Sequence, residues 1–164
     1  MTEEIEREIG EPTAEPEPTS TRRFPILMSP LWRPLLLPFG ATTDRAFVDV
    51  EDGEMHVRFG FLFDHRFPLD HVEGVAHSHW PLWGGIGWRT NFRGNIGLIG
   101  TYVNIVEVRF KEPERVRMIL PLPCRRLYLS IEEPQAFIAS LGGEIHAAKG
   151  RPPSLPRRRR AKAA

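Results

Sequence analysis

Hydrophobic and polar residues alternate along much of the chain between positions 45 and 131, with the period of a β-strand that buries one face. The clearest alternation lies at residues 47–50 and 55–61, on either side of Asp52 and Gly53. An Asp-Gly pair between alternating runs favours a tight hairpin turn. We expect the second run to place a set of apolar side chains on one core face: Met55, Val57, Phe59, Phe61 and Phe63.

Further strands are predicted at residues 72–78, around 96–99, and at 103–110, 116–122 and 126–131. In the last of these, Leu127, Leu129 and Ile131 alternate with Tyr128 and Ser130. The pattern predicts a seven-stranded antiparallel β-barrel or sandwich. Its interior should be filled by Val48, Val57, Phe59, Val106, Val108, Leu127, Leu129 and Phe137.

One helix is predicted after the strands. Pro134 suits the first helical position because it lacks an N–H that would need a partner there. Phe137, Ile138 and Leu141 form an apolar stripe that can close a barrel mouth, and Gly142 is the expected stop. The fold class is therefore mainly β, capped by one C-terminal α-helix.

Composition divides the chain into four zones. Residues 1–23 are acidic and Pro-rich, residues 24–42 form a Pro-rich apolar arm, and residues 149–164 are basic. Both ends have too little apolar surface to offset ordering entropy, so we expect them to be disordered. The arm is expected to pack on the barrel of residues 43–148, the alternative being a partner-binding arm. Residues 22–148 carry fourteen basic and fourteen acidic side chains.

The lone Cys124 cannot form an internal disulfide, and the acidic N-terminus lacks the features of a secretory signal. The most apolar early stretch is too interrupted by prolines to span a bilayer. A cytoplasmic location is expected, with contact to the inner face of the membrane as an option.

Several segments resemble bacterial members of the pleckstrin-homology-like superfamily, of the uncharacterised actinobacterial type. They are the Asp-Gly hairpin, "HVRFGFLF", "FPLDHVEGV", "RRLYLSIEEP" and the closing "PQAFIASLG". The resemblance covers residues 43–142. It implies a binding platform without enzymatic activity or cofactor.

One feature departs from phosphoinositide-binding members of that superfamily. They meet the headgroup with basic residues on the first hairpin, because several donors are needed for a multiply charged phosphate. Here the hairpin carries Glu51, Asp52 and Glu54, which would repel a phosphate. Headgroup binding at the usual place is disfavoured.

A Gly-rich segment at residues 80–94 holds the candidate partner or ligand site. Tryptophan and arginine together supply wide stacking surfaces with donors, as at interface hot spots. The candidate residues are Trp80, Trp83, Trp88, Arg89, Asn91 and Arg93. The alternative is that the tryptophans only pack beneath a long loop.

Other chemistry finds little support. The glycine spacing matches neither a dinucleotide fingerprint nor a Walker loop. His71, His77 and His79 lie near one strand without an evident further ligand, and Cys124 has no assignable base. We therefore expect no catalytic residue, metal or cofactor.

The C-terminal tail contains Arg157, Arg158, Arg159 and Arg160, which could act as an electrostatic anchor on an anionic membrane. Binding of nucleic acid is not expected to be its role, and a solvated tail is the alternative. The sequence predicts a non-enzymatic binding or scaffold module that contacts a protein partner or an anionic membrane surface. A small-molecule-binding barrel or barrel enzyme, with its ligand near the 80–93 loop, is the second hypothesis. The oligomeric state is left open.

Overall fold

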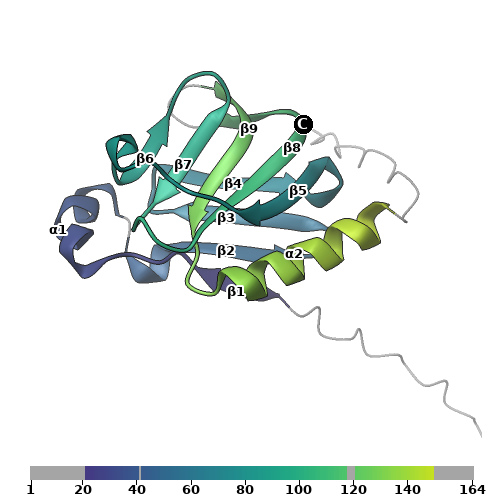
Figure 1. The fold of residues 1–164 in the computed structure, drawn as a ribbon, viewed down its shortest axis with the longest axis horizontal. Coiled ribbons are helices and arrows are strands. Elements are labelled where there is room, and N and C mark those ends of the chain that lie inside the picture. Colours follow the sequence, from purple (N-terminus) through teal and green to yellow (C-terminus); the bar gives the residue numbers. More distant parts are fainter. Residues whose placement is uncertain (1–20, 41, 118–120, 150–164) are drawn as a thin grey trace, which may run out of the picture.

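The computed structural model describes residues 21–40, 42–117 and 121–149. Within these ranges the chain forms two β-sheets and a long C-terminal helix, α2 (Figure 1). The strands are β1 Arg22–Pro25, β2 Ala46–Glu51, β3 Glu54–Phe59, β4 Phe63–Pro68, β5 Val72–His77, β6 Gly87–Thr90, β7 Asn95–Ile99, β8 Ile105–Arg117 and β9 Pro121–Ser130. The α-helices are α1 Arg33–Leu36 and α2 Pro134–Lys149, and short 3-10 helices lie at Pro30–Trp32, Leu37–Phe39, Thr43–Arg45, Leu69–His71 and Leu82–Gly84.

The expectation of a mainly β fold with a C-terminal helix is confirmed, but the closed seven-stranded barrel is wrong. The described residues form nine strands in two separate sheets, ordered β1-β2-β3-β4 and β5-β8-β9-β7-β6. The expectation of purely antiparallel pairing is also wrong, because β7 runs parallel to β9. Such a pair joins strands far apart in sequence, which local alternation cannot reveal.

The predicted Asp-Gly hairpin is confirmed. β2 and β3 pair up to Glu51 and Glu54, and the turn residues Asp52 and Gly53 both adopt positive φ. Positive φ at both central positions is typical of the tight turns that match strand twist. The predicted core face is wrong at Phe61, which is 66% exposed. Gly60 has a φ of 63° and begins the turn into β4, so the alternation ends at Phe59.

The interior between the sheets is filled by apolar side chains. All eight residues predicted to fill it are buried, at 1% exposure or less. Three phenylalanines add to these eight, and of the three only Phe63 was predicted for the core face: Phe67 stacks against Phe110 at 4.7 Å between ring centroids, and Phe63 stacks against Phe67. The expectation of a solid interior is confirmed for the described residues.

Helix α2 begins at Pro134 as predicted but runs through Gly142 to Lys149, so the predicted stop is wrong. A glycine costs only about 1 kcal/mol inside a helix, which neighbouring packing can override. The Phe137 ring meets the Phe24 ring of β1 edge-on at 5.2 Å, and α2 also lies against β5. The helix therefore joins the β1 edge of one sheet to the β5 edge of the other instead of capping a barrel mouth (Figure 1).

The apolar arm begins as part of the first sheet. Phe24, Ile26 and Met28 are buried, and the Ile26 amide donates to Ala46. Beyond Ser29 the chain forms short helical turns, where Leu31, Leu35 and Leu37 are more than half exposed. Two residues of the expected acidic tail, Arg22 and Arg23, belong to β1; residues 1–20 of that tail and Arg157 to Arg160 lie outside the described residues.

Candidate functional site

A pocket of about 320 Å³ opens on the outer face of the five-stranded sheet. Strand alternation creates this face: Leu127 and Leu129 of β9 point into the core, so Tyr128 between them points outward. On the adjoining strand, Gly97 occupies the outward position between the buried Ile96 and Leu98. The segment between β5 and β6 then folds back over these two positions.

Trp80 holds that segment in place. Its indole ring lies 5.3 Å from the Tyr128 ring, and its Nε1–H donates to the Gly85 carbonyl at 2.9 Å. A Cβ at Gly97 would lie 2.6 Å from the Trp80 ring, and one at Gly84 would lie 2.8 Å from its Nε1. These positions need glycine because the large ring takes the space that a side chain would fill.

The same segment is tied down at a second point, because the Tyr102 hydroxyl donates to the Leu82 carbonyl at 3.1 Å. Between the two attachments the short helix Leu82–Gly84 presents Leu82 at 75% and Trp83 at 90% exposure. At this exposure, the Trp83 ring is not packed against apolar side chains of the described part of the chain.

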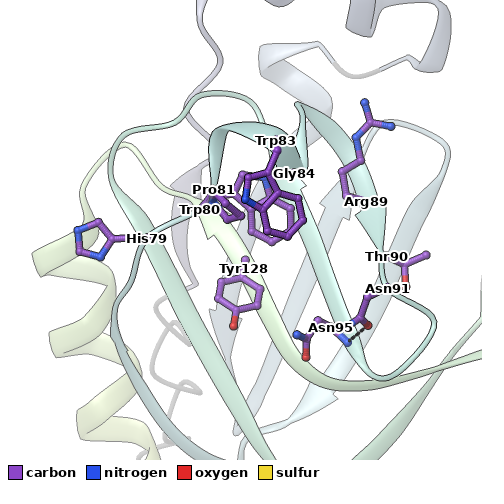
Figure 2. A pocket seen from close by; sticks show the side chains of 10 residues that line it. All are labelled: His79, Trp80, Pro81, Trp83, Gly84, Arg89, Thr90, Asn91, Asn95 and Tyr128. Carbon is purple, nitrogen blue, oxygen red and sulfur yellow. Dashed lines mark hydrogen bonds between the residues drawn. The ribbon is translucent and has the colours of Figure 1, made fainter.

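Figure 2 shows how the lining residues lie around the rings of Trp80, Trp83 and Tyr128. His79 and Arg89 lie on opposite sides of these rings, and Thr90, Asn91 and Asn95 come from β6, β7 and the turn between them. The Asn91 Oδ1 accepts hydrogen bonds from the amides of Arg93 and Asn95, both at 2.9 Å, which fixes the turn. Aromatic surface therefore lies beside a set of polar side chains, the usual composition of a binding pocket.

Of the six predicted site residues, Trp80, Trp83, Arg89 and Asn91 line the pocket. Trp88 does not: it packs against the hydrophobic core, and its Nε1 is buried without a hydrogen-bond partner among the described residues. The alternative of structural packing thus applies to Trp88, since it lies on the strand one residue from the outward-facing Arg89. The Arg93 side chain is exposed in the β6–β7 turn and does not line the pocket.

Sequence reasoning missed five further lining side chains, His79, Pro81, Thr90, Asn95 and Tyr128. A usable signal existed for Tyr128, whose alternation with Leu127 and Leu129 already placed it on the outer face. Trp80 covers its ring, and Tyr128 is only 9% exposed. That burial also raises the pKa of the Tyr128 phenol, and Glu107 adds to the rise while Arg126 opposes it.

The arrangement of Cys124 and of the three histidines does not favour catalysis or metal binding. Burial, with the nearby charge of Glu114, raises the pKa of the Cys124 thiol to about 12, so the reactive thiolate is suppressed. His71 pairs with Glu114 at 2.5 Å, away from His77 and His79. No group of three or more side chains arranged to hold a metal ion occurs in the part of the chain that the structure describes.

Over residues 21–40, 42–117 and 121–149, no helix combines the length and apolar character required to cross a bilayer. Comparisons with protein-family models, with curated proteins and with solved structures each found no significant match to this chain.

Proposed function

We propose that this protein is a non-enzymatic binding module that takes up a segment of a protein partner at the Trp80–Tyr128 pocket. The observation that carries the proposal is Trp83, 90% exposed on a segment that is held by the Trp80 ring against Tyr128 and by the Tyr102–Leu82 hydrogen bond. An aromatic side chain held in place before binding loses little entropy on contact, which is why tryptophans are common hot spots.

The filled interior supports the same conclusion. With buried apolar side chains between the sheets, a ligand would bind at the surface, and the recess beside Trp83 offers it aromatic side chains. The pleckstrin-homology-like assignment is part of the proposal and is supported by the strands that precede one long C-terminal helix. We extend the proposal to a cytoplasmic location, on the grounds of the lone cysteine.

A small-molecule ligand is the second candidate. It is favoured by the pocket volume of about 320 Å³, which falls at the lower end of the range of about 300–1,000 Å³ typical of ligand pockets. Such a ligand would stack on the indoles and bond to the polar residues of β6 and β7.

Selection of peptides from a random phage-displayed library on the full-length protein tests the proposal. We expect enriched peptides to bind the wild type and to lose at least tenfold in affinity with Trp83→Ala. Phe61→Ala is the matched control, because Phe61 is also an exposed aromatic, 66% accessible, but lies in the β3–β4 turn of the other sheet. Equal losses in the two variants, or no selectable peptide together with stabilisation by a small-molecule library, would overturn the proposal in favour of a different surface or of the second candidate.

A further inference from the structure

Uncompensated positive charge accompanies the pocket. Arg89 lies on β6, Arg93 in the β6–β7 turn and Arg125 on β9, and all three are exposed. Among the described residues, none of the three has a carboxylate within ion-pair distance, whereas Arg23 and Arg66 each have one. In this respect the three arginines differ from Arg23 and Arg66 of the four-stranded sheet.

Glu107, a carboxylate of the outer face, is engaged elsewhere. Glu107 of β8 lies 3.7 Å from Arg109 and 3.8 Å from Arg126, and it accepts a hydrogen bond from Ser78. The pKa of Arg126 is raised chiefly by its hydrogen bond with the Tyr128 side chain and then by the charge of Glu107, with a smaller contribution from Glu73. The negative charge of this face therefore lies near Arg126, and the arginines on the β6 side remain without a neutralising carboxylate within the described part of the chain.

The arginine positions are fixed by the backbone around them. Gly85 has a φ of 74°, and a Cβ there would lie 2.8 Å from the Arg89 Nε, so the guanidinium group lies close over the chain at the pocket rim. Arg125 packs against Gly94 of the β6–β7 turn, since a Cβ at Gly94 would lie 3.1 Å from the Arg125 Cβ. Arg125 therefore borders the turn that carries Asn91 and Arg93, whereas the Arg89 guanidinium lies beside the 80–86 segment.

We propose, on the basis of the proposed function, that the partner segment bound at this pocket is acidic, with its carboxylates meeting Arg89 at the pocket and Arg93 and Arg125 at the adjoining β6–β7 turn. Guanidinium groups form paired, charge-assisted hydrogen bonds with carboxylates, and their planar donors suit this ligand better than a point charge does. The recess between the covered Tyr128 and the protruding Trp83 fits a side chain of a peptide, whereas a bilayer offers a flat surface.

The test uses the full-length protein and pairs of synthetic peptides. Each pair consists of a peptide selected from the library and a counterpart in which every Glu and Asp is replaced by Gln and Asn. We expect selected peptides to be acidic and the amide counterparts to bind at least tenfold more weakly. Each of the variants Arg89→Gln and Arg125→Gln should bind the acidic peptide several-fold more weakly than the wild type. The control Arg22→Gln, which removes an exposed arginine of β1 on the other sheet, should change nothing.

The dependence of binding on salt gives a second readout. Raising the salt concentration from about 0.1 M to about 1 M shortens the Debye length from about 10 Å to about 3 Å and should lower the affinity for the acidic peptide. Peptides that bind without acid preference and lose affinity with Trp83→Ala but not with Arg89→Gln would overturn this inference while leaving the proposed function intact. Binding to vesicles of phosphatidylcholine and phosphatidylglycerol that is lost in Arg89→Gln, with no peptide bound, would overturn both and assign the surface to a membrane.

Discussion

The substitution Gly97→Ala tests how the pocket is built. The new methyl group would lie 2.6 Å from the Trp80 ring, about 1 Å inside the normal carbon–carbon contact distance. The ring cannot simply slide, because its Nε1 bonds to Gly85 and its face lies against Tyr128. Overpacking of this kind costs about 1–3 kcal/mol, so we expect the free energy of unfolding to fall by that amount.

Thermal or urea denaturation measures the change. For a chain of this size, a loss of about 1–3 kcal/mol lowers the melting temperature by roughly 2–10 °C. Displacement of Trp80 should also alter the near-ultraviolet circular dichroism of the native protein. The matched control is Gly74→Ala in β5 of the same sheet, where an added Cβ meets no atom within 4 Å.

We expect Gly74→Ala to be neutral or stabilising by up to about 1 kcal/mol, since alanine has less conformational freedom to lose in a strand than glycine. The two glycines thus differ in the neighbour that their Cβ would meet, not in the type of element. Gly97→Ala as stable as Gly74→Ala, with unchanged circular dichroism, would show that Trp80 does not cover β7.

Three further predictions follow from the core and from the pKa directions. Phe137→Ala should lower the free energy of unfolding by about 3–5 kcal/mol, whereas Phe92→Ala, at a residue 68% exposed, should not. Equal denaturation midpoints for the two variants would show that α2 does not contribute to the core through Phe137. Cys124 should resist alkylation in the native protein at pH 8 and react once the protein is unfolded, because its pKa is raised to about 12; rapid native labelling, followed by mass spectrometry, would contradict its burial. Burial lowers the pKa of His65, so the unfolded chain binds the proton more readily than the folded protein does. The contribution of neutral His65 to the free energy of unfolding is therefore full above about pH 6.5 and is lost as the pH falls. His65→Gln should reduce the dependence of the free energy of unfolding on pH in urea titrations at acidic pH, and an unchanged dependence would refute this prediction.

Local patterns predicted those parts of the fold that depend on neighbouring residues. The β2–β3 hairpin follows from Asp52-Gly53 and from alternation on both sides, and the interior positions follow from the same period. Phe61 was misplaced because a positive φ at Gly60 ends the strand, which the residue types alone do not reveal. The β7–β9 pairing depends on contacts between distant segments and carries no local signal.

The candidate site was predictable in part from a single segment, although His79, Pro81 and Thr90 of the same stretch were missed. Trp80, Trp83, Arg89 and Asn91 lie close together in sequence and were found by composition. Tyr128 and Asn95 join them through the folding of the 80–86 segment over β7 and β9. Trp88 was wrongly grouped with them because composition does not distinguish the two faces of β6.

The most direct test of the binding pocket is a titration of the ¹⁵N-labelled protein with a selected peptide, followed through the indole Nε1–H resonances of the four tryptophans. Each reports a different place: Trp83 is exposed at the rim, Trp80 bonds to Gly85, and Trp88 is packed against the core, as in part is Trp32. We predict that the Trp83 and Trp80 resonances shift on saturation while those of Trp88 and Trp32 stay in place. Saturable binding that shifts Trp32 or Trp88 and leaves Trp83 unchanged would contradict the assignment of the pocket.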